Sequence, residues 1–319
     1  MELPVRVFIT NPNNYLFSHI VRQLRESNCE ISTLLWDPIE EQKFDLSNIE
    51  IFYATLRNKE SFEHVLHKVD VVIHLLENVF YSDNQFTEKY HLTCLNNLLL
   101  LAKEENVTKF IFHSYLNITG EKTVPYIRLF RSLEALIEKR STPYTIIKSA
   151  IPIGGDDQIS QSFSAVLKCL PIMILPKSNS KKLLTIATSD LVKIVKNIIF
   201  TNNYKNEKIE VACLERITLF DFTSRIKEKM AIKRLFIFLP DRLWDFIFLF
   251  LHKVFRFNKA FQVIFLTNFR WSLRKNHIKN ILDYQPNILQ KSLEFIDKPS
   301  FFKALSIISA NYNRHRRFR

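Results

Sequence analysis

The sequence predicts an α/β fold of the doubly wound kind, in which helices cover both faces of a parallel sheet. Apolar runs of strand length recur through the first half of the chain, and segments with helical spacing of apolar residues separate them. The first run, 5–9, leads into a turn that holds Pro12 and three asparagines, and apolar residues from Leu16 to Leu24 then mark one face of a helix. A strand, a tight turn and a helix in this order open a βαβ unit that can bind a dinucleotide.

The length and composition allow one large domain. The chain has 319 residues, which is enough for a large α/β domain with a small additional lobe. Three glycines are few, since average usage is about 7%. Further strands are expected at 30–38, 49–54, 69–76, 107–114 and 208–213. The helix with the clearest pattern is expected at 90–102.

The cysteines give no sign of a metal site. Cys29, Cys94, Cys169 and Cys213 are far apart and form neither a CxxC pair nor a metal-ligand spacing. We expect reduced thiols in a cytoplasmic protein, and no bound metal. The N-terminus lacks a cleavable signal pattern, and no apolar stretch reaches the roughly 20 residues that a membrane span needs.

Positive charge is concentrated in the last third of the chain. Residues 225–319 carry 20 Lys/Arg against 6 Asp/Glu, a balance of +14, and the preceding residues carry 25 against 26, a balance of −1. An aromatic-rich apolar helix is expected from Arg242 to about Phe255. This helix either packs within a C-terminal lobe or docks on a membrane, with its aromatic residues inserted and nearby cations on anionic headgroups. The charge alone would also suit nucleic acid, but no recognition motif is present, so no specific nucleic-acid partner is expected.

The turn after the first strand carries a family resemblance. Residues 10–21 resemble the TGxxGxxGxxLV start of extended and atypical short-chain dehydrogenase/reductases (SDRs), which bind NAD(P) in a Rossmann-like fold. Thr10 matches the threonine, while Asn11, Asn14 and Phe17 occupy the three glycine positions. Asparagine adopts positive φ more readily than most residues, so the first two exchanges can preserve the turn, whereas the ring of Phe17 is expected to fill the cofactor site. The alternative is that this loop is only a turn.

The second strand adds one candidate cofactor residue. Asp37 precedes Pro38 at its end, where members of the family often carry an acidic residue that selects the adenosine ribose. An acidic side chain there suits a 2′-hydroxyl better than a 2′-phosphate. The resemblance thus implies Thr10, Asn11, Asn14 and Asp37 as the cofactor residues of a degenerate loop, with no cofactor or weak NAD(P) binding. The alternative for Asp37 is an ordinary loop aspartate before a proline.

The catalytic segment is also altered. SDR chemistry uses Tyr-x-x-x-Lys on one helix, where the tyrosine donates a proton and the lysine lowers its pKa and holds the nicotinamide ribose. Residues 124–131 resemble the PYLRSK form of this motif, with Tyr126 present and Phe130 at the lysine position. Ser114 matches a serine at the end of the fifth strand of the family. The resemblance implies Tyr126 and Ser114 as remnants of a catalytic site.

Co-linear blocks extend the resemblance from about Val5 to about Met230. Residues 69–76 are similar to the family's fourth strand, VDVVFHLA, in which His74 is interpreted as a core histidine. Residues 141–157 are similar to GLPYTILRPSIVFGPED and keep Gly154 and Gly155. The chain is most similar to NAD-dependent epimerase/dehydratase-like proteins of the atypical branch that includes the SDR-related accessory subunit of respiratory complex I. Several members of that branch bind nucleotide without a demonstrated turnover.

The sequence therefore predicts an SDR-type domain at 1–224, with part of a substrate lobe interleaved from about 151, and a basic, aromatic-rich helical lobe and tail at 225–319. We expect a catalytically degenerate protein that acts in binding, assembly or as a scaffold. Its partner is expected to be a protein or an anionic membrane surface, contacted through 225–319, which would place it peripherally at a membrane. The alternatives are an NAD(P)-dependent oxidoreductase or epimerase with a non-standard site, and an anionic-membrane or polyanion binding protein.

Overall fold

The fold was analysed in a computed structural model of the whole chain. The structure describes residues 3–35, 38, 46–76, 88–119, 125–140, 142–154, 157–177, 182–213, 215–247, 270–282, 293, 296, 298–305 and 307.

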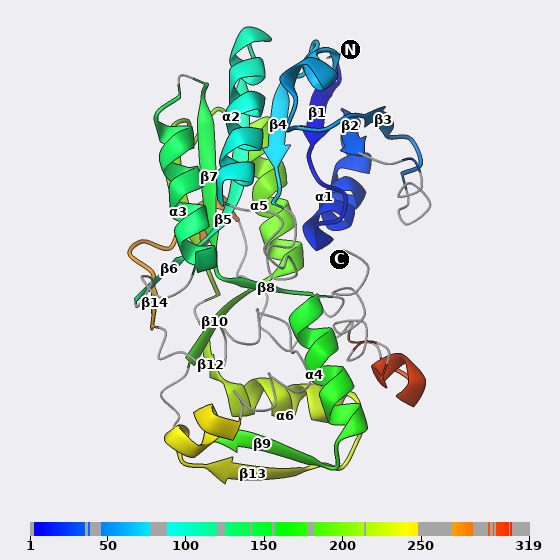
Figure 1. Cartoon of the computed structure of the whole chain (residues 1–319), viewed down its shortest axis with the longest axis vertical. Helices are drawn as coiled ribbons and strands as arrows, with labels where there is room; N and C mark the ends of the chain where they lie inside the picture. Colours follow the sequence, from blue (N-terminus) through cyan, green and yellow to red (C-terminus); the bar gives the residue numbers. More distant parts are fainter. Residues whose placement is uncertain are drawn as a thin grey trace.

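A seven-stranded parallel sheet is the centre of the molecule (Figure 1). Its strand order is β11-β7-β5-β4-β1-β2-β3, so the chain first runs to one edge and then returns past β1 to build the other half. Every neighbouring pair is parallel. The strands are β1 Val5–Ile9, β2 Cys29–Leu35, β3 Glu50–Tyr53, β4 Val71–His74, β5 Lys109–Tyr115, β7 Tyr144–Ser149 and β11 Glu207–Val211. The doubly wound fold predicted from the sequence is confirmed.

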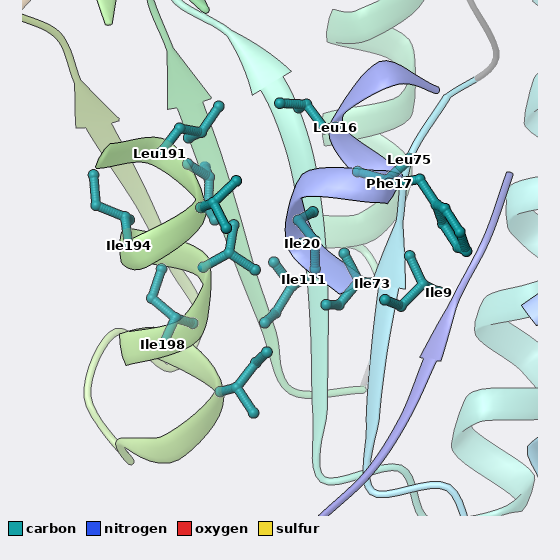
Figure 2. Packing of buried hydrophobic residues seen from close by; sticks show 14 of the residues in the cluster. Ile9, Leu16, Phe17, Ile20, Ile73, Leu75, Ile111, Leu191, Ile194 and Ile198 are labelled. Carbon is teal, nitrogen blue, oxygen red and sulfur yellow. The ribbon is translucent and has the colours of Figure 1, made fainter. Parts of the chain in front are cut away.

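Helices cover both faces because the strands are apolar on both sides, as parallel strands require. One face packs against α1 (Tyr15–Arg25), α5 (Thr188–Phe200) and α9 (Ile278–Ile281), and the other packs against α2 (Glu88–Glu104), α3 (Pro125–Glu138) and the 3₁₀ helix η2 (Lys59–Leu66). Alternate residues of one strand divide between the two cores: Ile9 belongs to the first and Phe8 to the second. Figure 2 shows part of the first core.

A second lobe lies beyond the carboxyl ends of these strands (Figure 1). It contains a three-stranded sheet of β8 (Ile151–Ile153), β10 (Lys182–Ala187) and β12 (Arg216–Thr218), and a two-stranded parallel ribbon of β9 (Ile172–Pro176) and β13 (Leu235–Leu239). Helices α4 (Gln158–Cys169) and α6 (Leu219–Lys229) pack against these strands around a third core, which includes Phe163, Phe222 and Trp244.

Segments on both sides of residue 225 build this lobe. β9 pairs with β13, and Trp244 is buried with Phe163 and Met173. The part of the expected apolar helix that the structure describes is helical at 241–247, and the rest of it lies outside the described residues. Within the described part of the chain, no helix is long and apolar enough to cross a membrane.

The chain then returns to the first domain. β14 (Arg270–Ser272) pairs with β6 (Asn117–Thr119), and the carboxylate of Glu210 accepts from the backbone amides of Arg274 and Lys275. Asn276 exchanges hydrogen bonds with the backbone of Ala212, which fixes the segment that leads into α9. Residues within 225–319 therefore contribute to both lobes.

Candidate functional site

The turn after β1 lies at the point where the strand order reverses. β2 and β4 flank β1 on opposite sides, so the chain leaves β1 toward one half of the sheet and later returns to build the other. Ligands of open parallel sheets bind at such a switch point, outside the carboxyl ends of the strands. The sequence-predicted cofactor residues Thr10, Asn11 and Asn14 all lie here.

Thr10 is fully engaged within the protein. Its hydroxyl lies 3.0 Å from Nδ1 of His74, accepts from the backbone amide of Leu75 at 2.9 Å and lies 3.2 Å from the Leu75 carbonyl. Burial and, to a smaller extent, the nearby His91 lower the pKa of His74 to about 3, so His74 is neutral at physiological pH. Its ring stacks on Phe112. His74 is a hydrogen-bonded core histidine, as the sequence indicated, and it joins β4 to the end of β1.

The two asparagines preserve the turn by different means. Asn11 has φ of 59°, the left-handed conformation that a glycine would otherwise supply. Asn14 is the N-cap of α1: its side-chain oxygen accepts from the amide of Leu16 at 2.9 Å, and its side-chain nitrogen donates to the carbonyl of Leu76 at 2.8 Å. The backbone carbonyl of Asn14 accepts from the amide of Phe17, and its own amide donates to Asn11. Three amides at the start of α1 are therefore used within the protein.

Phe17 does not point into the cofactor crevice, and the expectation that it would fill this site is wrong. The side chain is 2% exposed and belongs to the core beneath α1. Figure 2 shows it projecting from α1 toward Leu75 and Ile9. Phe17 occupies the position whose glycine, in the dinucleotide-binding motif, allows close helix–strand packing. In this chain the ring itself supplies the packing between α1 and the sheet.

Ser114 is part of a buried ionic cluster that the sequence did not reveal. Its side chain is fully buried, and its hydroxyl donates to the carboxylate of Glu134 on α3. The same carboxylate accepts from Arg131, and Lys148 on β7 donates to it at 3.1 Å. Lys148 also donates to the side-chain oxygen of Asn117 at 2.8 Å. We call Ser114, Asn117, Arg131, Glu134 and Lys148 the Glu134 cluster.

Two cations of this cluster, Arg131 and Lys148, share one carboxylate, and Lys208 lies 3.8 Å from it as well. Burial lowers the pKa of Lys148, an effect that Glu134 opposes and the neighbouring Arg131 reinforces. Arg131 is further fixed by the backbone carbonyls of Tyr115 and Leu116. The cluster joins α3 to the ends of β5 and β7.

The lysine position of the catalytic motif is closed. Phe130 is buried in the second core, and its ring contacts Phe112 and Tyr115. Tyr126 is the second residue of α3, but its side chain lies outside the description, as does Asp37 as a whole. Ser114 is linked to α3 by its hydrogen bond to Glu134, which lies one helical turn after Phe130. One signal for Lys148 was available in the sequence: it is the single charged residue in the strand 144–149.

No metal centre is formed by the described residues, since none of their His, Cys, Asp and Glu side chains gather in groups that could hold an ion. His113, another buried histidine, bonds to the Ser149 hydroxyl at 2.9 Å, and burial lowers its pKa to about 4. The histidines of the site region therefore act as neutral hydrogen-bonding groups of the core.

Comparison with known proteins identifies the family. The model of the NmrA-like family matches residues 5–240, which is the greater part of the chain. The chain therefore belongs to the NmrA-like family.

Solved structures with the same fold include epimerases and a reductase. The chain is similar to a nucleoside-diphosphate-sugar epimerase from Staphylococcus aureus, with 15% identity, a TM-score of 0.70, and 91% of this chain and 100% of that one covered. It is similar to the UDP-glucose 4-epimerase of Thermotoga maritima, with 14% identity, a TM-score of 0.69, and 94% and 99% covered. It is also similar to the Citrobacter sp. triphenylmethane reductase complexed with NADP(H), with 10% identity, a TM-score of 0.67, and 91% of this chain and 99% of that one covered. The resemblance to atypical SDRs is confirmed, and the NAD(P)-binding type of fold with it.

Proposed function

From this membership of the NmrA-like family and the state of its site, we infer that the protein is a binding or assembly protein that has lost SDR turnover. The observation that carries this proposal is the closed turn at the start of α1. A helix N-terminus binds phosphate through backbone amides that point at the ligand. Here the amide of Leu16 donates a hydrogen bond to the side-chain oxygen of Asn14, and the amide of Phe17 donates one to the backbone carbonyl of Asn14. These two amides are therefore not available to a phosphate.

The hydrogen-bond donors that remain at the turn favour weak dinucleotide binding. The side-chain nitrogen of Asn11 is buried and has no hydrogen-bond partner among the described residues, so it could donate to a ligand oxygen. One such donor does not replace the set of amides that holds a pyrophosphate. The groups present fit a tight NAD(P) site poorly, and we derive no reaction through that cofactor.

The catalytic positions support the same proposal. With Phe130 in a closed aromatic core, no lysine is available at this position to lower the pKa of Tyr126. The hydroxyl of Ser114 is already donated to Glu134 and is fully buried. An oxidoreductase or epimerase would have to use Tyr126 without this lysine, or a different proton donor.

Titration calorimetry with NAD(H) and NADP(H) tests this proposal directly. We expect dissociation constants weaker than about 1 mM, which corresponds to a binding free energy smaller than about 4 kcal/mol. Micromolar binding of either dinucleotide would contradict the closed-turn argument. Hydride transfer to any member of a broad carbonyl panel, abolished by Tyr126→Phe, would establish the oxidoreductase alternative instead.

We further propose that the binding role is exercised at an anionic surface through the basic last third of the chain. Residues 225–319 hold a charge balance of +14, and each cation near an anionic membrane surface contributes about 1 kcal/mol. Deleting residues 314–319 removes four arginines without touching a described element. We expect this truncation to weaken sedimentation with anionic vesicles and to reduce its salt dependence. Unchanged sedimentation would remove the tail from the proposal.

A further inference from the structure

Exposed apolar side chains gather on the second lobe. Of the fourteen large hydrophobic residues that are exposed in the described part of the chain, eight belong to this lobe. They come from the C-cap of α4, from β9 and β13, from the N-terminal end of α6 and from the helical segment 241–247, and the ribbon forms the lower end of the molecule in Figure 1. These eight are Leu170, Ile172, Phe220, Leu235, Ile237, Phe238, Leu243 and Phe246.

The β9–β13 ribbon has an apolar side that faces away from the core. The register pairs Leu235 with Ile172 and Ile237 with Ile174, which puts these four side chains on one side of the ribbon; Ile174 is partly buried against the third core, and the other three are exposed. Leu235 is 67% exposed, and Ile172 and Ile237 are each 41% exposed. The alternate residues Met173 and Leu175 are buried, and Phe236 is packed against the third core. Contiguous exposed apolar area of this kind marks an interaction site.

Cations flank both strands of the ribbon along the chain. Segments 168–177 and 229–240, which contain the two strands, hold five Lys/Arg and no Asp/Glu: Lys168, Lys177, Lys229, Lys233 and Arg234. Arg234 is anchored to the carbonyls of Leu167 and Lys168, which keeps its charge at the start of the ribbon. Lys227 lies over the ring of Phe236 at 4.8 Å. The carboxylates of the lobe are on neighbouring elements: Asp157 at the N-cap of α4, Glu215 before β12, Asp221 and Glu228 on α6, and Asp241 and Asp245 on the segment 241–247.

We infer that the outward side of the β9–β13 ribbon, formed by Ile172, Leu235 and Ile237, inserts into an anionic lipid bilayer. This inference deepens the proposed role at an anionic surface and rests on it. An apolar centre with cations at both ends suits the acyl–headgroup boundary of such a bilayer. A second copy of the chain fits less well, because a two-fold contact between identical ribbons would bring like charges together.

The proposed membrane contact includes β9, whereas the sequence predicted contact through residues 225–319 alone. β9 precedes residue 225, so half of the ribbon lies outside the basic last third. Deleting 225–319 would remove β13 and Trp244 and open the third core, so point substitutions are the proper test.

The test uses the full chain and sedimentation with phosphatidylcholine vesicles, with and without phosphatidylserine. We expect Leu235→Ser with Ile237→Ser to lower the partition coefficient about ten-fold or more, because two apolar side chains no longer insert. The matched control is Phe200→Ser with Tyr53→Ser, two apolar residues that are as exposed but lie on the first domain, and it should bind like the wild type. Lys229→Gln with Lys233→Gln should lower binding about five-fold per cation. Its control is Lys103→Gln with Arg128→Gln, two exposed cations of α2 and α3.

A depth measurement separates insertion from electrostatic adsorption. The fluorescence of Leu235→Trp should be quenched by brominated acyl chains, while that of Phe200→Trp should not. Sedimentation of the Leu235→Ser, Ile237→Ser variant like that of the wild type would overturn the inference. Equal binding of the wild type to neutral and anionic vesicles would also overturn it. So would a wild-type dimer that the same variant converts to a monomer. Loss of binding on deleting 314–319 with no effect of the ribbon variant would retain the proposed function and reject only the ribbon. Unfolding curves of each variant show whether the fold is intact.

Discussion

Replacing Glu134 with glutamine should destabilise the protein strongly, because the carboxylate is buried among cations. The side chain is 2% exposed, and its two oxygens accept from Ser114, Arg131 and Lys148. Arg131 would keep its two backbone carbonyls, but the glutamine offers one acceptor oxygen instead of two, and Lys148 would become a buried cation without an anion. Removing one partner of a buried ion pair costs about 3–5 kcal/mol, and we expect Glu134→Gln to lie within this range at pH 7.

Urea denaturation measures this loss, with the slope of the transition as a check that the same surface unfolds. The matched control is Glu138→Gln on the same helix. Glu138 pairs with Lys208 at 2.9 Å, and both side chains are partly exposed; Lys208 also has Glu134 at 3.8 Å, so the loss of Glu138 should cost about 1 kcal/mol or less. In the double variant Glu134→Gln, Lys148→Met no buried charge is stranded, so it should be more stable than Glu134→Gln alone.

The pH dependence of the variant gives an independent reading. Burial lowers the pKa of Lys148 below 10.5, and without Glu134 this lowering has less opposition. At a pH between the folded and the unfolded pKa of Lys148, this lysine is protonated in the unfolded chain and neutral in the folded one. Because the unfolded chain then binds more protons, the free energy of unfolding rises with pH. The deficit of Glu134→Gln should therefore shrink as the pH is raised from 7 toward 10. A loss below about 1 kcal/mol at pH 7, or a deficit that does not change with pH, would refute the description of this cluster as a buried, mutually dependent set of charges.

Three further outcomes follow from the same structure. Phe17→Ala should destabilise by about 3–5 kcal/mol in urea denaturation, because the ring is in the core; a loss below about 1 kcal/mol would place the ring in an open cleft instead. Asn14→Ala should cost about 0.5–2 kcal/mol through loss of the α1 cap, whereas Asn14→Gly should cost only a few tenths for the cap itself; equal losses would exclude the cap as the cause. His113 has a folded pKa of about 4 against 6.5 unfolded, so the neutral form stabilises the fold fully above pH 6.5 and this contribution, about 3 kcal/mol, is lost as the pH falls to 4. His113→Gln should flatten the stability profile in this window, and a profile identical to that of the wild type would contradict the assignment.

The sequence by itself determined the fold and its family. Strand-length apolar runs and helical spacing identified β1, β4, β5 and α2 within a few residues, because a strand buried on both faces must be apolar throughout. Asn11 at φ of 59° could also be anticipated, since a turn that lacks glycine needs a residue that tolerates this conformation.

Only the tertiary structure decided what the altered motif residues do. Phe17 lies in the core rather than in the crevice, because the direction of a side chain depends on the packing of α1 against the sheet. Lys148 and Glu134 are 14 residues apart and on different elements, so no local pattern could pair them. The apolar side of the ribbon likewise depends on the pairing of β9 with β13, across about 60 residues of chain. Local periodicity is fixed by neighbours along the chain, whereas these contacts are fixed by the arrangement of elements in space.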